Sequence, residues 1–129
     1  MKYLSIATGV IKNDNKYLIA RRTEPKWLKG KWEFPGGTVE SWETVEETLI
    51  REIKEEVNLV VKPVKQLYKI TEVVKDREIT INFIESEIIG DIDIKLEEHD
   101  MYEWIDASTW QNFEWTDLTY KFAQKIFKK

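Results

Sequence analysis

The sequence has 129 residues, of which 42% are hydrophobic and 12% aromatic, a composition that excludes a disordered chain and predicts one globular domain over residues 1–129. The formal net charge of -4 gives no reason to expect binding to duplex nucleic acid. There is no cysteine, which excludes disulfides and thiolate metal sites. Neither a secretory signal nor a membrane span is visible, so we expect a cytoplasmic protein without membrane contact.

Two strands joined by a tight turn are expected at the N-terminal end. Residues 3–12 and 17–21 are β-rich, and the Asn and Asp residues at 13–15 tolerate the left-handed backbone of a turn. The two strands therefore predict a hairpin. A polar connection over 23–31 leads to residues 32–37, a short strand that a proline and two glycines would end.

Residues 44–57 have the clearest helical pattern. Thr44 and Glu47 have the spacing of a capping box, in which each side chain satisfies a backbone N–H group at the start of a helix. The apolar side chains that recur at the helical period are Val45, Leu49, Ile50, Ile53 and Val57. They predict the face that packs on the core.

The second half of the chain begins with two long β-rich stretches, residues 59–74 and 78–88, separated by a turn. Pro63 places its part of the first stretch at a sheet edge or a break. A loop or irregular strand is expected over 90–100, and a short strand over 102–105.

The C-terminal segment has the pattern of an amphipathic helix that starts near Thr116 or Asp117. Its apolar positions are Leu118, Phe122, Ala123, Ile126 and Phe127. Strands and helices in this mixed order predict an α+β fold, in which helices pack on a mixed sheet.

The helix at 44–57 carries a group of carboxylates. At about 100° per residue, Glu52 and Glu56 project within about 40° of each other, and Glu55 lies about 60° further round. Like charges this close repel, and a hard cation such as Mg²⁺ would relieve the repulsion. A solvated acidic face explains the same pattern, and the helix alone leaves both interpretations open.

The residues before this helix distinguish the two interpretations. The paired glycines at 36–37 free the backbone to approach a ligand. From the second of them, the pattern reads Gly, five residues, Glu, seven residues, then Arg-Glu-apolar-any-Glu-Glu-any-Asn-apolar. This resembles the Nudix box, which has Gly where Asn58 stands here. Asn is the usual second choice for the left-handed residue that ends a helix, so the exception is a conservative one.

The resemblance implies an α/β/α sandwich and hydrolysis of a nucleoside diphosphate-linked substrate with Mg²⁺, or Mn²⁺ in its place. The catalytic and metal-binding carboxylates that it implies are Glu52, Glu55 and Glu56. The carbonyl of Gly36 or Gly37 would add a metal ligand, and Glu52 is the candidate for the general base or for orienting the water. Glu43 and Arg51 would support the loop and the helix.

The resemblance extends to the MutT-like branch of the family over essentially the whole chain. Residues 9–11, 21–22, 31–37 and 103–104 lie at MutT-like spacings. This branch hydrolyses nucleoside triphosphates to a monophosphate and pyrophosphate, which implies a role in removing modified nucleotides such as 8-oxo-dGTP in DNA repair.

Four further roles follow from the MutT-like resemblance. Glu98 would be an additional metal ligand, Arg21 or Arg22 would contact phosphate or base, Phe34 would pack beside the base, and Asp117 would read it. Each of these residues also has a purely structural interpretation. Glu98 could be a solvated loop acid, and Arg21 or Arg22 could be a charged residue at a strand end. Phe34 could be a core aromatic, and Asp117 could cap a helix.

The identity of the substrate stays open. Asp117 could accept a hydrogen bond from the amine of cytosine or, when protonated, donate one to a modified purine. The box is equally compatible with a modified pyrimidine triphosphate, a nucleotide sugar, a dinucleoside polyphosphate or a capped RNA, and the last is disfavoured because no basic stripe is visible. A non-catalytic nucleotide sensor would be expected to lack part of the carboxylate set. His99 is expected to face solvent in a loop, and no protein partner is indicated.

Overall fold

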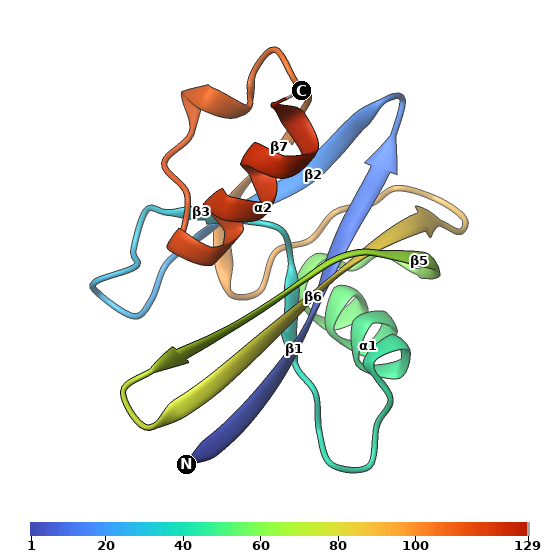
Figure 1. Cartoon of the computed structure of the whole chain (residues 1–129). Helices are drawn as coiled ribbons and strands as arrows, with labels where there is room; N and C mark the ends of the chain where they lie inside the picture. Colours follow the sequence, from blue (N-terminus) through green and yellow to red (C-terminus); the bar gives the residue numbers. More distant parts are fainter. Residues whose placement is uncertain (129) are drawn as a thin grey trace.

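The computed structural model describes residues 1–128 and contains a seven-stranded mixed sheet with two α-helices (Figure 1). The strands are β1 (Lys2–Asn13), β2 (Lys16–Arg22), β3 (Trp32–Glu33), β4 (Gly36–Thr38), β5 (Val61–Val74), β6 (Arg77–Ile88) and β7 (His99–Ile105). The helices are α1 (Val45–Val57), α2 (Asp117–Phe127) and the short 3-10 helix η1 (Trp110–Asn112). The strand order is β3-β2-β1-β6-β5, with β4 paired to β1 and β7 to β2. Strands β1 and β6 run parallel, and the other strand pairs are antiparallel.

The predicted hairpin between the first two strands is confirmed. Asp14 and Asn15 form its turn with φ of 51° and 61°, the left-handed conformation that Asp and Asn tolerate. The two strands pair only next to this turn, where Lys12 lies opposite Tyr17. Beyond it they diverge, so that β1 pairs with β4 and β6 while β2 pairs with β3 and β7.

The glycines after the third strand do not end the strand structure as expected. The chain resumes as β4, which pairs antiparallel with β1 and places Gly36 opposite Thr8. A Cβ atom on Gly36 would lie 2.0 Å from the carbonyl oxygen of Ala7. Glycine is therefore required here because the backbones of β4 and β1 approach so closely.

The two faces of the sheet are covered by different helices. Neighbouring residues of one strand point to opposite faces. Val10 belongs to the core cluster that includes Phe122 of α2, whereas Ile11 packs in the cluster that includes Leu49 of α1. The α+β fold with a mixed sheet between helices is thus confirmed, as Figure 1 illustrates.

Helix α1 begins and ends as the sequence predicts. Both hydrogen bonds of the capping box between Thr44 and Glu47 are present, and Asn58 closes the last turn with φ 61° and ψ 36°. The predicted apolar face is wrong at Ile50, which is 42% exposed. Thr48 and Glu56 are buried on this helix in addition to its apolar residues.

The second half of the chain follows the expected order with shifted boundaries. Strand β5 lies at the sheet edge, and its register with β6 shifts between Pro63 and Lys65, as expected for proline. Strand β7 begins at His99, three residues earlier than expected, and η1 was not predicted. Thr116 is the N-cap residue of α2. None of the helices within residues 1–128 is long and apolar enough to cross a membrane.

Candidate active site

The three carboxylates of α1 differ in their burial. Glu56 is 8% exposed, the side chain of Glu52 is 17% exposed, and that of Glu55 is 57% exposed. The helix therefore directs Glu52 and Glu56 inward and leaves Glu55 at the rim.

Glu56 carries a buried carboxyl group that is not fully hydrogen-bonded. Its Oε2 atom has no hydrogen-bond partner within residues 1–128. Burial, and then the carboxylates of Glu52, Glu98 and Glu33, raise the pKa of Glu56 to about 9. Without a nearby positive charge, Glu56 is therefore protonated at neutral pH, and a cation would allow it to ionise.

Glu52 lies against the glycine-rich strand that precedes the helix. A Cβ atom on Gly37 would lie 2.2 Å from the carboxyl carbon of Glu52, so glycine at this position makes room for that side chain. Burial raises the pKa of Glu52, and the contact with Arg51 opposes this effect. A half-buried carboxylate with a raised pKa is suited to accept a proton.

Arg51 connects the carboxylates around the start of the site. Its Nε donates to Glu43 Oε2 at 2.6 Å and its Nη2 to Glu43 Oε1 at 2.8 Å. Its Nη1 donates to Glu52 at 2.8 Å and to Glu55 at 3.2 Å. The contact with Arg51 is the main reason that the pKa of Glu43 is lowered to about 2. This geometry fits the supporting role expected for Glu43 and Arg51.

The loop before β7 brings Glu98 to the end of α1. The Glu97 N–H donates to the carbonyl of Glu56 at 3.2 Å, and the Thr23 hydroxyl donates to the carbonyl of Glu98 at 2.8 Å. The charge of Glu98 contributes to the raised pKa values of both Glu52 and Glu56. A residue distant in sequence thus completes a cluster of carboxylates.

Beside this cluster lies a hydrogen-bonded pair of side chains that sequence reasoning missed. The expectation that His99 faces solvent is wrong, because its side chain is 3% exposed and its Nε2 lies 3.1 Å from Glu33 Oε2. Glu33 was not singled out at all. The alternation of the buried aromatics Trp32 and Phe34 around Glu33 is the signal that this side chain points to the opposite face.

The two candidate arginines have different surroundings. Arg22 donates from Nη1 to both carboxylate oxygens of Glu33, at 3.1 and 3.0 Å. Arg21 pairs with Asp100 at 2.8 Å, away from Glu33. A register shift between Arg21 and Arg22 in the pairing of β2 with β7 accompanies this division. The structure therefore places Arg22, and not Arg21, next to the carboxylate cluster.

The two candidates for base contacts differ in their exposure to solvent. Phe34 is 2% exposed and stacks on Trp115 at 5.7 Å between ring centroids, so its ring belongs to the core. Asp117 is exposed at the start of α2. It lines a hollow of about 670 Å³ together with Phe113, Trp115 and other residues.

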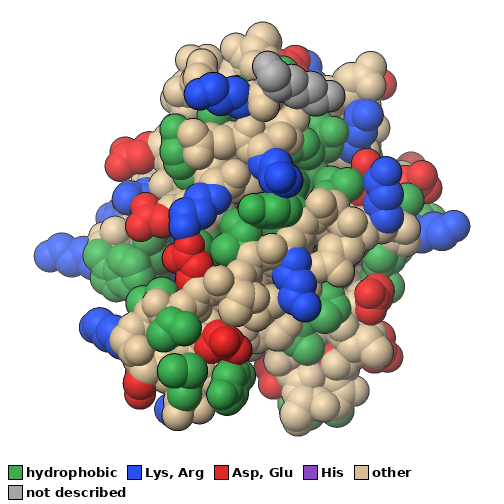
Figure 2. All heavy atoms as spheres, viewed as in Figure 1, with side chains coloured by type: hydrophobic (Ala, Val, Ile, Leu, Met, Phe, Trp, Pro, Cys, Tyr) green, Lys and Arg blue, Asp and Glu red, His purple; other side chains and the backbone are tan. Residues whose placement is uncertain are grey.

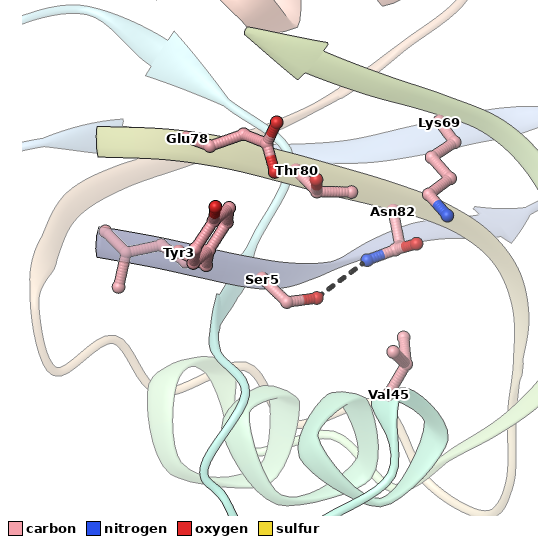
Figure 3. Close-up of a pocket in the computed structure, with 8 residues that line it drawn as sticks. Tyr3, Ser5, Val45, Lys69, Glu78, Thr80 and Asn82 are labelled. Carbon is pink, nitrogen blue, oxygen red and sulfur yellow. Dashed lines mark hydrogen bonds between the residues drawn. The ribbon is translucent and has the colours of Figure 1, made fainter. Parts of the chain in front are cut away.

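A second hollow, of about 320 Å³, contains none of the expected site residues (Figure 3). It is lined by polar side chains of β1, β5 and β6, among them Ser5, Lys69, Thr80 and Asn82. The Asn82 amide is already used, since it donates to Ser5 and accepts from Gln66. The lining of this hollow therefore gives no indication of a ligand site.

The carboxylate cluster fits a hard divalent cation. Within residues 1–128, no three acidic or histidine side chains already lie close enough to enclose an ion. Arg51 donates hydrogen bonds to Glu52 and Glu55, whereas Oε2 of Glu56 has no hydrogen-bond partner in the described part of the chain. Carboxylate oxygens without nitrogen or sulfur donors are the ligands that Mg²⁺ prefers.

Comparison with known proteins agrees with this arrangement. Residues 3–125 match the family model described as NUDIX domain. The chain belongs to the Nudix family. This Nudix chain is 39% identical over 84 residues to the 8-oxo-dGTP diphosphatase of Escherichia coli (strain K12), covering 64% of the chain and 65% of that relative. It is 41% identical over 83 residues to the 8-oxo-dGTP diphosphatase of Proteus vulgaris, covering 64% of the chain and 74% of the relative.

The fold agrees with a solved Nudix-type structure. The MutT protein of Methanosarcina mazei Go1 superposes with a TM-score of 0.81 at 23% identity, over 99% of this chain and 97% of that one. Together with the named relatives, this similarity confirms the resemblance to the MutT-like branch. Nudix hydrolases generally use a divalent metal.

Proposed function

We propose that residues 1–129 form a single Nudix domain that hydrolyses a nucleoside triphosphate to a monophosphate and pyrophosphate, with Mg²⁺ or Mn²⁺ as cofactor. The observation that carries this proposal is the buried Glu56 carboxyl, which lies near the carboxylates of Glu52, Glu98 and Glu33 and whose Oε2 atom has no partner among residues 1–128. Maintaining such a group is costly for stability, and a bound cation offsets the cost.

The proposed roles follow from burial and position. Glu52, Glu56 and Glu98, with a carbonyl of Gly36 or Gly37, would hold the cation, and Glu55 at the rim would add a charge. A cation there would neutralise the phosphate charge that builds up during hydrolysis. Glu52 would accept the proton of the attacking water, and Arg22 would contact a phosphate oxygen with its planar donors.

The base would lie toward α2. The segment before α2 is joined to β3, because the Trp32 N–H donates to the Glu114 carbonyl at 2.8 Å and the Thr116 N–H donates to the Trp32 carbonyl at 3.1 Å. Strand β3 also carries Glu33, so one short strand links the carboxylate cluster to Asp117. The names of the two relatives support a modified purine nucleotide such as 8-oxo-dGTP. The amine of cytosine is the alternative partner for an ionised Asp117.

Sites of this kind also act on nucleotide sugars and dinucleoside polyphosphates, so the substrate panel includes them. Figure 2 shows basic and acidic side chains interspersed on one face, without a basic stripe for a nucleic acid. The intact carboxylate set favours an enzyme over a nucleotide sensor. A cytoplasmic location stays a prediction.

The test is turnover of a panel with Mg²⁺ or Mn²⁺. It is read as monophosphate plus pyrophosphate for the triphosphates, as monophosphate plus sugar phosphate for the nucleotide sugar, and as two nucleotides for the dinucleoside polyphosphate. The panel contains the common nucleoside triphosphates, 8-oxo-dGTP, a modified pyrimidine triphosphate, a nucleotide sugar and a dinucleoside polyphosphate. We expect Glu52→Gln to lower kcat by at least about a hundredfold. Glu46→Gln is the matched control, since Glu46 lies exposed on the same helix. Wild-type turnover by Glu52→Gln would remove the role assigned to Glu52, and an unchanged order of preferred nucleotides in Asp117→Asn would exclude Asp117 as the base reader.

A further inference from the structure

We propose that His99 is a positioning residue, which acts through Glu33 to hold the Arg22 guanidinium at the carboxylate cluster. The proposal rests on the proposed function, because Arg22 is assigned there to a substrate phosphate. It concerns a residue outside the Nudix box and outside the carboxylate set.

His99 is built into the protein interior rather than placed on a loop. Its side chain is 3% exposed, and its one hydrogen bond within residues 1–128 joins Nε2 to Glu33 Oε2 at 3.1 Å. Its Nδ1 atom is buried and has no partner within those residues. A carboxylate oxygen can only accept a hydrogen bond, so we assign the donor role in this contact to Nε2. The His99 side chain therefore makes a single polar interaction within these residues, in which it donates a hydrogen bond to Glu33.

Glu33 needs that donor because of its neighbours. It lies on β3, a strand of only two residues, and the charge of Glu33 is felt by Glu56. Repulsion from the carboxylate cluster would favour rotation of the Glu33 side chain away from its present position. Arg22 and His99 both form hydrogen bonds with the Glu33 carboxylate, so the orientation of Glu33 depends on both.

Arg22 is left with free donors by this arrangement. Its Nε donates to the Glu24 carbonyl at 3.0 Å, and its Nη1 donates to both oxygens of Glu33. No hydrogen bond uses Nη2 within the part of the chain that the structure describes. The side chain of Arg22 is 31% exposed, so Nη2 is available to an oxygen of a ligand. An arginine held at Nε and Nη1 offers Nη2 in one direction, which lowers the entropic cost of binding.

His99 also lies next to Glu98, and this neighbour supplies the competing explanation. A change at His99 could act by displacing Glu98 instead of Arg22. Displacement of Glu98 would lower kcat and raise the metal concentration needed for half-maximal rate. Loss of the orientation of Arg22 would raise KM for the nucleotide and leave both of those quantities near their wild-type values.

The experiment compares His99→Met with His99→Gln in the full chain. Met fills a similar volume without a donor, whereas the Gln amide nitrogen can reach the position of Nε2. We expect His99→Met to raise KM roughly five- to tenfold with kcat within about twofold, and His99→Gln to restore most of the loss. Asp100→Asn is the matched control, since it breaks the ion pair with Arg21 beside His99 and leaves Glu33 untouched; its KM should stay at the wild-type value.

Two further measurements keep the proposal separate from the proposed function. The combined variant His99→Met with Arg22→Gln should have the KM of Arg22→Gln alone, because both changes remove the same contact. Side-chain nitrogen NMR of labelled arginine should show faster rotation of the Arg22 guanidinium in His99→Met than in the wild type, without any substrate. Additive effects on KM, unchanged Arg22 signals, or a loss in kcat and metal dependence would each overturn the role of His99. Absence of turnover in the wild type would instead contradict the proposed function, and the NMR result would still decide the role of His99.

Discussion

Helices α1 and α2 are of similar length but are held in place by different means. The ends of α1 are fixed by its own sequence, through the capping box of Thr44 and Glu47 and the left-handed Asn58. Thr116 makes no such side-chain cap for α2. Helix α2 is held instead by aromatic packing, above all by Phe122, whose ring stacks on Phe83 with 4.1 Å between centroids.

This difference in how the two helices are stabilised corresponds to the acidic side chains that each helix carries. Helix α1 carries the buried Glu56, which weakens the packing of its inner face in the absence of a cation. Strong local capping lets α1 form despite this group. Helix α2 exposes Asp117 at its first residue and has no buried acid, so packing alone is sufficient. The formation of α1, which carries the buried acid, thus depends more on the capping residues at its ends than the formation of α2 does.

The largest expected loss of stability from a single substitution concerns the aromatic contact of α2. We expect Phe122→Ala to lower the free energy of unfolding by about 3–5 kcal/mol, because a large side chain is lost from the core. Amide hydrogen exchange should rise first in α2, while the amides of α1 stay protected. Tyr120→Ala on the exposed side of α2 is the control and should cost less than about 1 kcal/mol. Equal loss of protection in both helices would show that α2 does not depend on this contact more than α1 does.

The next effect is a pH dependence that belongs to α1. The folded-state pKa of Glu56 is raised from 4.5 to about 9, so the folded protein binds this proton more tightly than the unfolded chain. Its contribution to stability is therefore present at low pH and is lost as the pH rises from about 4.5 to about 9, by at most about 1.4 kcal/mol per pH unit.

Urea unfolding in the presence of a chelator measures this dependence. Glu56→Gln should flatten the stability of the protein between these pH values and should make it more stable than the wild type at high pH. Glu46→Gln serves again as the control, with the wild-type slope. A wild-type slope in Glu56→Gln would show that the burial of Glu56 has no effect on the stability of α1.

The smallest expected effect on stability comes from the N-cap residues, and it differs between the two helices. Thr44→Ala should lower the free energy of unfolding by about 1 kcal/mol, because two hydrogen bonds of the capping box are lost or weakened. Thr116→Ala should cost about half as much or less, since the side chain of Thr116 makes one hydrogen bond within residues 1–128, to the Thr119 hydroxyl. Urea unfolding of the two variants measures this difference directly. Equal losses would contradict the view that only α1 is capped by its own sequence.

The predicted parts of the fold are those that depend on neighbours in sequence. The hairpin turn at Asp14 and Asn15, the capping box and the left-handed Asn58 all follow from local backbone chemistry. Strand β4 was not predicted because its pairing with β1 depends on residues far apart in the sequence. Ile50 was assigned to the core because periodicity shows which residues share an arc but not how wide the buried part of that arc is.

The candidate site likewise contains residues that local sequence predicts and residues that only the fold brings together. The carboxylates of α1 and the supporting pair of Glu43 and Arg51 lie within one motif, so their spacing was enough to find them. Glu33 and His99 are 66 residues apart, and only the pairing of β2 with β3 and β7 brings them together. A lone histidine in a polar stretch has no local pattern that predicts its burial, which is why His99 was assigned to solvent.

Gly36 and Gly37 stand next to each other, but substitution is restricted at the two positions for different reasons. A side chain on Gly36 would meet the backbone of Ala7, which cannot yield without breaking β1 from β4. The three atoms nearest to a Cβ on Gly37 would be Cδ, Oε2 and Cγ of Glu52, which belong to a flexible side chain that can rotate away. We therefore expect a side chain at Gly36 to prevent folding, and a side chain at Gly37 to leave a folded protein in which the Glu52 carboxylate is displaced. Adjacent codons would then be constrained by two different kinds of selection, one on folding and the other on chemistry.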